Sequence, residues 1–226
     1  MRRSVLLGMR PGVVHGFSTV ADTGASLRPP VPDGAWRGLA AAAGGPGMPV
    51  AWMSQVHGAT VLEAQGPGPV GEADALLTRR PGLLLAVRTA DCVPVLVASP
   101  QGVAAIHAGW RGVAARVVPA AVAALGGASA AVAAVGPAIG GAVYEVGPEV
   151  VDGLRAAGIP LAVFLRPRPG RRPTVDLAAA VAHQLRAAGV GAVEVLPDCT
   201  FQDRGLHSHR RDGDAAGRNA GLIGWR

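Results

Sequence analysis

Residues 89–112 read TADCVPVLVASPQGVAAIHAGWRG and contain the strongest structural signal in this sequence of 226 residues. Residues 93–98 and 103–107 are apolar runs rich in β-branched side chains, as expected of buried strands. The Ser-Pro-Gln-Gly sequence between them, at 99–102, is typical of a turn. Together these features predict an antiparallel β-hairpin.

The predicted hairpin also brings two reactive side chains together. Cys92 immediately precedes its first strand and His107 ends its second. Since paired antiparallel strands lie about 4.8 Å apart, the thiol and the imidazole emerge at the same open end. A Gly-Trp-Arg-Gly segment follows at 109–112, where the backbone can approach a ligand closely and Arg111 can face an anion.

Further strands and helices are predicted before and after the hairpin in the sequence. Strands are expected at residues 50–55, 59–63, 73–78, 83–87, 130–135 and 192–196, the last of them buried. A helix is expected after Gly112, with Pro119 either kinking it or starting another. Further helices are expected at residues 149–157 and 176–188, the second with Asp176 as its N-cap.

This order of elements predicts an α+β fold. Strand pairs are mixed with helices, and the strict alternation of a doubly wound parallel sheet is absent. We expect a single layered domain over residues 1–226, with mixed β-sheets and flanking helices. Residues 22–47 are rich in Gly, Pro and Ala, with a helical tendency at 35–43, and are expected to form an irregular surface excursion.

Composition argues against membrane and secreted proteins. Half of the residues are hydrophobic but only 4% are aromatic, so the core must be built mainly from Ala, Val and Leu. No apolar run approaches the roughly 18 residues that span a bilayer. The apolar stretch after Arg3 stops at Gly8, which is too short for a secretory signal. We therefore expect a cytoplasmic protein without a membrane partner.

The net charge of +6 comes from 21 basic residues, all of them arginine. These arginines form no stripe along a predicted helix and do not alternate with aromatic residues, as they do on many nucleic-acid-binding surfaces. We expect no nucleic-acid partner and only a weak preference for anionic ligands.

Cys92 has three possible roles on the residues alone. It can be a small buried hydrophobe, or the nucleophile of a cysteine hydrolase with His107 as its base, acting for example on cell-wall precursors. It can also be a metal ligand, because His57 lies at another strand-to-turn junction. Two His, one Cys and an open position are the donor set of a catalytic zinc site. The other cysteine, Cys199, is interpreted as structural.

A second cluster of polar residues lies near the C-terminus, around His207-Ser208-His209. Ser208, Arg210 and Arg211 have the donors needed to hold a phosphate or a ribose. The alternative interpretation is a solvated tail, which the residues alone favour slightly.

Several motifs occur together in a recognisable order. They are Gln-Val-His-Gly at 55–58, Thr-Ala-Asp-Cys-Val-Pro-Val at 89–95, Ile-His-Ala-Gly-Trp-Arg-Gly at 106–112, Val-Gly-Pro-Ala-Ile-Gly at 135–140, Tyr-Glu-Val-Gly at 144–147 and Ser-His-Arg-Arg at 208–211. As a set they strongly resemble the laccase-domain family, also called multicopper polyphenol oxidoreductases or the peptidoglycan editing factor family.

The resemblance implies a zinc-dependent enzyme of purine nucleosides. Members of the family phosphorolyse adenosine, inosine, guanosine and methylthioadenosine, and deaminate adenosine. The family's zinc ligands map onto His57, Cys92 and His107. The expected partners are therefore a purine nucleoside and phosphate, and the expected cofactor is Zn²⁺.

The resemblance also implies roles for further residues. Cys92 and His107 are expected at the catalytic centre, with Asp91 as a proton carrier in deamination. Arg111 or Arg210 is expected to balance the charge of phosphate. Gln55, Ser208 and Arg211 complete the expected substrate-binding set.

The sequence also departs from the family. The region at 19–29 lacks the Asn and the Arg of the family's usual N-terminal pattern, which leaves a non-catalytic nucleoside-binding protein as an alternative. The six histidines include a single His-x-His pair, too few for the several copper sites of a laccase.

Overall fold

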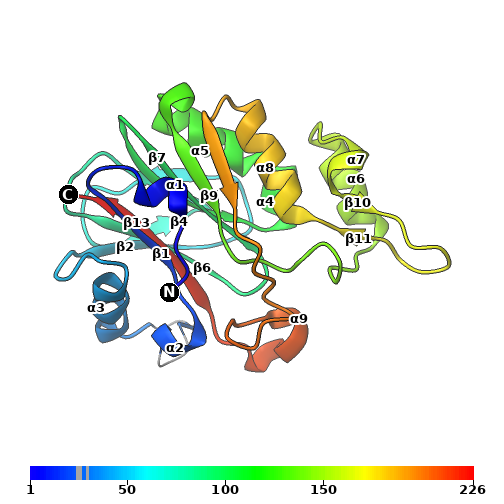
Figure 1. Cartoon of the computed structure of the whole chain (residues 1–226), viewed down its shortest axis with the longest axis horizontal. Coiled ribbons are helices and arrows are strands. Elements are labelled where there is room, and N and C mark those ends of the chain that lie inside the picture. Colours follow the sequence, from blue (N-terminus) through cyan, green and yellow to red (C-terminus); the bar gives the residue numbers. More distant parts are fainter. Residues whose placement is uncertain (24–26, 29–30) are drawn as a thin grey trace.

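The computed structural model describes residues 1–23, 27–28 and 31–226. Two mixed β-sheets lie face to face at its centre, with helices on both outer sides (Figure 1). The α+β fold with mixed sheets and flanking helices that the sequence predicts is therefore confirmed.

The larger sheet contains the predicted hairpin and has the strand order β12-β9-β7-β8-β5-β3. Its strands are β3 (Val61–Glu63), β5 (Ala75–Thr78), β7 (Val93–Ser99), β8 (Gly102–Ala108), β9 (Val132–Val135) and β12 (Ala192–Val195). The hairpin β7–β8 is confirmed and lies between β9 and β5. The strand expected to be buried at 192–196 is instead the partly exposed edge strand β12.

Both faces of the hairpin are covered, which explains its continuous apolar sequence. Side chains alternate across a strand. Val95 and Ile106 face the cluster under the helices, whereas Leu96 and Ala105 face the second sheet. A strand buried on both faces therefore needs apolar residues at every position.

The second sheet has the strand order β1-β13-β6-β2-β4. Its strands are β1 (Val13–Phe17), β2 (Val50–Ser54), β4 (Gly68–Glu72), β6 (Leu84–Thr89) and β13 (Asn219–Trp225). Strand β13 pairs with both β1 and β6. Before it, Leu206 and Ser208 are fully buried, so the interpretation of the polar C-terminal cluster as a solvated tail is wrong for these two residues. A Cβ at Gly221 of β13 would lie 3.1 Å from Val87, so close packing against β6 favours glycine there.

Helices cover the outer face of each sheet. Against the larger sheet lie α4 (Trp110–Ala114), α5 (Val117–Leu125), α6 (Pro148–Ala156), α7 (Leu161–Phe164) and α8 (Leu177–Ala187). The predicted N-cap is confirmed, because Asp176 accepts a hydrogen bond from the Ala179 amide. The region after Gly112 forms two helices separated at Arg116, which has a φ of 64°. Pro119 lies in the first turn of α5, where its missing N–H has no helical partner.

Residues 22–47 were expected to be an irregular surface excursion with a helical tendency at 35–43. Helix α3 (Asp33–Ala42) confirms the helical tendency, but it contradicts the surface placement because it buries Trp36, Leu39 and Ala40 against the second sheet. Residues 24–26 and 29–30 of the same expectation lie outside the described residues. The turns of α3 present small and large apolar residues on one side, and these form a third core cluster.

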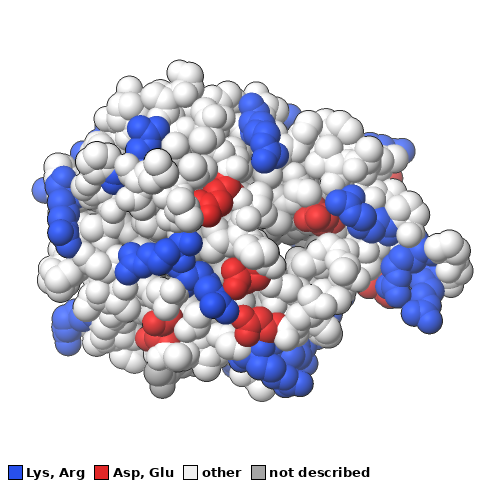
Figure 2. Space-filling model, viewed as in Figure 1, with Lys and Arg blue, Asp and Glu red and all other residues white. Residues whose placement is uncertain are grey.

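The remaining elements are short. They are α1 (Val5–Gly8), α2 (Val20–Thr23), α9 (His209–Asp212), the 3₁₀ turns η1 (Ala128–Ala130) and η2 (Gly213–Ala215), and the strand pair β10 (Leu165–Arg166) with β11 (Thr174–Val175). Within the described residues, no helix has the length and apolar character that a membrane crossing requires. Arginine side chains on the face shown in Figure 2 form separate patches with acidic groups between them.

Candidate metal centre

The open end of the β7–β8 hairpin carries a group of three potential metal ligands. Pro94 pairs with His107 across the hairpin, and Cys92 lies just outside this pair. The turn after β2 brings His57 to the same place. The ligand atoms of His57, Cys92 and His107 all lie within 4.8 Å of one another, and the Cys92 Sγ is 4.0 Å from the His57 Nε2.

One buried carboxylate holds the His57 turn in place. Asp74 is fully buried just before β5, and its oxygens accept hydrogen bonds from the backbone amides of His57, at 3.0 Å, and Gly58, at 2.6 Å. His57 itself has a φ of 60°, a conformation that a non-glycine residue rarely adopts. The two hydrogen bonds compensate for this backbone strain.

The same carboxylate orients the second histidine. The Nδ1 of His107 lies 2.7 Å from Asp74 Oδ1, and a carboxylate can only accept. Nδ1 therefore carries a proton, and Nε2 is left to face Cys92. A carboxylate behind a ligating histidine is the usual arrangement around protein-bound metals, because it fixes the tautomer and the ring orientation.

Proton affinities within the group are strongly shifted. Burial alone would raise the pKa of the Cys92 thiol, but hydrogen bonds from His107 and His57 lower it to about 6. Burial opposes the charged form of His107, but its hydrogen bonds to Asp74 and Cys92 raise its pKa to about 9. Cys92 is therefore poised as a thiolate at neutral pH, which is the form that binds metals or attacks electrophiles.

The arrangement fits a tetrahedral metal ion. With bonds of about 2.3 Å to sulfur and about 2.0–2.1 Å to nitrogen, ligand atoms of a tetrahedral zinc site lie roughly 3.3–3.6 Å apart. The three side chains need only small movements to reach this spacing. A Cβ at Gly109 would lie 3.1 Å from both the Cys92 Sγ and the His57 ring, so glycine there leaves the centre its space.

The three side chains form one wall of a pocket of about 390 Å³. The pocket is lined by Gln55, His57, Arg88, Thr89, Ala90, Cys92, His107, His209 and Arg218. No carboxylate is among these described residues, whereas two arginines are. The pocket therefore combines a metal centre with a positively charged wall.

Gln55 and Asp91, both predicted at the site, have their side chains engaged with the backbone around the pocket. The Gln55 amide donates to the carbonyl of Arg88, at 2.6 Å, and accepts from its N–H, at 2.8 Å. Asp91 has a φ of 90°, and its two oxygens accept from the Thr200 hydroxyl and the Arg210 amide, each at 2.6 Å. Asp91 directly precedes Cys92, so its hydrogen bonds hold the start of α9 next to the thiol.

The two arginines expected to face phosphate lie over aromatic rings. The Arg111 guanidinium is exposed and stacks 4.5 Å from the Trp110 ring centroid. The Arg210 guanidinium lies 5.3 Å from the Tyr144 ring and donates to the carbonyl of Glu145.

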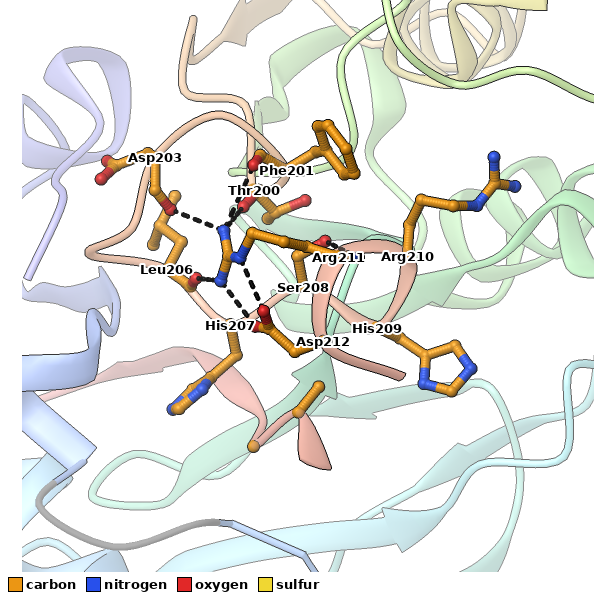
Figure 3. Close-up of polar contacts among 12 residues, drawn as sticks. Thr200, Phe201, Asp203, Leu206, His207, Ser208, His209, Arg210, Arg211 and Asp212 are labelled. Atoms are coloured by element: carbon orange, nitrogen blue, oxygen red, sulfur yellow. Dashed lines mark hydrogen bonds and ion pairs between the residues drawn. The ribbon is translucent and has the colours of Figure 1, made fainter. Parts of the chain in front are cut away.

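The side chains of Ser208 and Arg211 make hydrogen bonds that hold the α9 turn and the loop before it in place. The buried Ser208 hydroxyl accepts from the Arg211 amide as the N-cap. The Arg211 guanidinium donates to four backbone carbonyls and to Asp212 (Figure 3). These bonds use every N–H of the guanidinium. In this turn it is His209 that lines the pocket.

Two residues that bear on the site, Asp74 and Arg88, are missing from the sequence-based set. His209 and Arg218 belong to the C-terminal polar cluster that the sequence suggests for phosphate or ribose, but no individual role was predicted for them. Arg88 does give a signal, because it is the one charged residue in strand β6. Asp74 has no local signal of this kind, since its role arises only when distant segments come together.

The fold and the pocket define a class of protein. It pairs two mixed sheets and carries a two-histidine, one-cysteine centre at the open end of a central hairpin. The chain belongs to the family described as multi-copper polyphenol oxidoreductase laccase, whose model matches residues 34–226. The resemblance stated from the motifs is therefore confirmed.

Curated relatives carry the name purine nucleoside phosphorylase. The chain is 42% identical over 192 residues to the one from Deinococcus radiodurans, covering 82% of this chain and 74% of the relative. It is 46% identical over 183 residues to the one from Streptomyces coelicolor, covering 77% and 74%.

Solved structures share the whole fold. YlmD from Geobacillus stearothermophilus matches with a TM-score of 0.83 and 30% identity, over 95% of this chain and 92% of that one. Protein NMB0706 from Neisseria meningitidis matches with a TM-score of 0.81 and 30% identity, over 96% and 95%.

Proposed function

We propose that this chain is a zinc-dependent purine nucleoside phosphorylase that also deaminates adenosine. The observation that carries the proposal is the His57–Cys92–His107 group opening into a pocket whose described lining residues include no acidic side chain. Relatives of at least 42% identity named purine nucleoside phosphorylase support the phosphorolytic activity. Adenosine, inosine, guanosine and methylthioadenosine are the proposed substrates.

Zinc suits the donor set better than a multi-copper assembly. Within the described part of the chain, His57, Cys92 and His107 are the only group of histidine, cysteine and acidic side chains placed to share a metal. A laccase needs further histidine clusters for its other copper ions. Two histidines, one thiolate and an open position are the ligands of catalytic zinc sites.

A zinc ion held by these three side chains would supply Lewis acidity and lower the pKa of water at the pocket wall. The chain's own residues prepare the geometry. Asp74 keeps the Nε2 of His107 and the turn of His57 directed at Cys92. Gln55 fixes the β6 backbone at Arg88, and Asp91 fixes α9, which brings His209 to the pocket.

Both proposed reactions fit a pocket of this kind. In phosphorolysis, a phosphate oxygen bonds to C1′ of the ribose while the C1′–N9 bond breaks and its electron pair moves onto the purine. The proton of hydrogen phosphate passes to the base, giving ribose 1-phosphate and the free purine. In deamination, water oxygen bonds to C6 of adenine and ammonia leaves, giving inosine.

The hydrogen bonds of Asp91 argue for a positioning role. Both of its oxygens already accept short hydrogen bonds from Thr200 and Arg210. A group that transfers protons must come within hydrogen-bond reach of the substrate, and the described residues that line the pocket do not include Asp91. We therefore assign Asp91 the task of holding α9 in place of the proton transfer expected from the sequence.

A cysteine hydrolase is the competing function, and the lowered pKa of Cys92 favours it. The role of His57 separates the two, because a Cys–His pair does not require a second histidine at the thiol. The test is to incubate zinc-loaded protein with adenosine and phosphate and to follow adenine, inosine and ribose 1-phosphate by chromatography. Formation of adenine and ribose 1-phosphate is expected, and their absence at full zinc occupancy would refute the phosphorylase.

A further inference from the structure

Two arginines share the pocket wall that faces the metal ligands. Arg88 belongs to β6, and Arg218 directly precedes β13, its antiparallel neighbour. In the register, Ala220 lies opposite Arg88. Since side chains alternate along a strand, the residue two before Ala220 faces the same side, diagonal to Arg88 and roughly 7–8 Å away. Both side chains line the pocket.

These guanidinium groups are partly buried and repel each other. Burial, followed by the charge of Arg218, lowers the pKa of Arg88. Burial, followed by the charge of Arg28, lowers the pKa of Arg218, outweighing the opposing effect of Cys92 and Asp91. Removing like charges from water without a counter-ion is costly, so this wall favours an anion.

Neither arginine is neutralised in the described part of the chain. The ion pairs found there involve other arginines, among them Arg79 with Glu63 and Arg211 with Asp212. The hydrogen bonds of the Arg88 guanidinium are long, at 3.3 and 3.5 Å to backbone carbonyls. Arg218 donates to carbonyls through Nη1 alone.

Thr89, the neighbour of Arg88 in β6, also lines the pocket. Within the described residues its buried side-chain hydroxyl has no hydrogen-bond partner, which is costly unless a ligand or water satisfies it. Because side chains alternate along a strand, this hydroxyl faces the other side of the sheet from Arg88 and does not share the arginine wall. The arginine wall itself offers guanidinium donors, which suit a tetrahedral oxyanion.

We propose that Arg88 and Arg218 form the binding site for inorganic phosphate. This inference rests on the proposed phosphorylase function and names the site of its second substrate. Phosphate held there shares one pocket with the metal ligands, where the proposed function also places the nucleoside. Arg111 and Arg210, which stack on aromatic rings, are the competing candidates.

The experiment measures KM for phosphate and for adenosine separately, on zinc-loaded protein. In Arg218→Gln and Arg88→Gln, we expect KM for phosphate to rise roughly 10–100-fold, since hydrogen bonds to charged groups are strong. KM for adenosine should change by a much smaller factor, and zinc content should stay at the wild-type level. Arg218→Lys keeps the charge and should recover part of the phosphate affinity.

The matched control is Arg186→Gln, which removes one exposed positive charge near the end of α8. It should leave KM for phosphate unchanged, which excludes a general effect of net charge. Unchanged KM for phosphate in both arginine variants, with a rise in Arg111→Gln, would overturn the proposal.

A second measurement separates this inference from the phosphorylase function. Inorganic phosphate should raise the melting temperature of zinc-loaded wild-type protein, and Arg218→Gln should lose this shift. If the protein binds phosphate in this way but releases no base from nucleosides, the proposed function fails and the subsite stands. No shift in wild type, or an equal shift in Arg218→Gln and Arg88→Gln, would overturn the subsite.

Discussion

The pocket has two walls that differ in how their charges are satisfied. On the metal wall, the buried carboxylate of Asp74 orients His107 and the turn of His57, and two histidines share hydrogen bonds with Cys92. On the arginine wall, Arg88 and Arg218 have no carboxylate partner among the described residues. The charged groups of the metal wall are paired within the protein, whereas we infer that a bound anion neutralises the two arginines.

This difference separates two kinds of mutational effect. Substitutions on the metal wall remove groups that support one another, so they should reduce metal binding and all activity together. Substitutions on the arginine wall should reduce the affinity for one substrate and leave the metal in place.

The largest effect is expected on removing a ligand. Cys92→Ser and His57→Ala should each lose stoichiometric zinc, and activity should fall by more than about a hundredfold, since even outer residues of metal sites contribute 10–100-fold. Zinc content is measured by elemental analysis beside the nucleoside assay. The matched control is Cys199→Ser, whose thiol accepts a hydrogen bond from Gly140 outside the metal group. Full activity of His57→Ala would instead favour the cysteine hydrolase.

The second effect is a loss of stability on changing strand β13, which directly follows Arg218. Leu222 is fully buried in β13, so Leu222→Ala should destabilise the protein by about 2–5 kcal/mol. Denaturant unfolding measures the change, with exposed Leu161→Ala as the comparison. A loss below about 0.5 kcal/mol, as surface substitutions give, would contradict the placement of β13 as an interior strand between β1 and β6.

Strand β13 was not predicted from the sequence. The hairpin and the helix after Asp176 were predictable, because apolar runs, turn residues and a cap lie next to one another in the chain. The sequence of β13, NAGLIGW, contains two glycines and no polar alternation. Its partner β6 lies about 130 positions earlier, and no local pattern encodes that pairing.

The same reasoning separates the site residues. His57, Cys92 and His107 were recognised from motifs, two of them on one hairpin. Asp74 acts through contacts between distant segments and was missed, whereas Arg218 belongs to the C-terminal polar cluster but had no role assigned to it. Arg211 was noticed because arginine and serine cluster near the C-terminus, yet its donors are all used on Asp212 and on carbonyls of the loop before α9. Clustering in sequence therefore did not distinguish a structural arginine from one that faces the pocket.

A smaller effect is expected at Asp74. In Asp74→Asn the side chain keeps its shape but loses the charge that fixes His107, so zinc affinity should fall by about 10–100-fold. Competition with a chelator of known affinity measures the change. Asp152→Asn, on the exposed surface of α6, is the control. An unchanged zinc affinity in Asp74→Asn would show that the tautomer of His107 is set in another way.

The smallest change in conditions, one pH unit, should also alter zinc binding. Between about pH 6 and about 9 the metal-free pair is a Cys92 thiolate beside a protonated His107. Zinc must then displace one proton, so its affinity should rise about tenfold per pH unit in this range. Below about pH 6 the thiol must also lose its proton, and the dependence steepens. A zinc affinity that is flat between these values would contradict the coupled pair.

The most direct test of the account is to add zinc stepwise to chelator-treated protein and follow ribose 1-phosphate formed from adenosine and phosphate. Activity should rise in proportion to added zinc and stop at one equivalent per chain, and Arg218→Gln should bind the same amount of zinc but need more phosphate. Activity that is already complete in the metal-free protein, or no ribose 1-phosphate at one bound equivalent, would contradict a zinc-dependent phosphorylase.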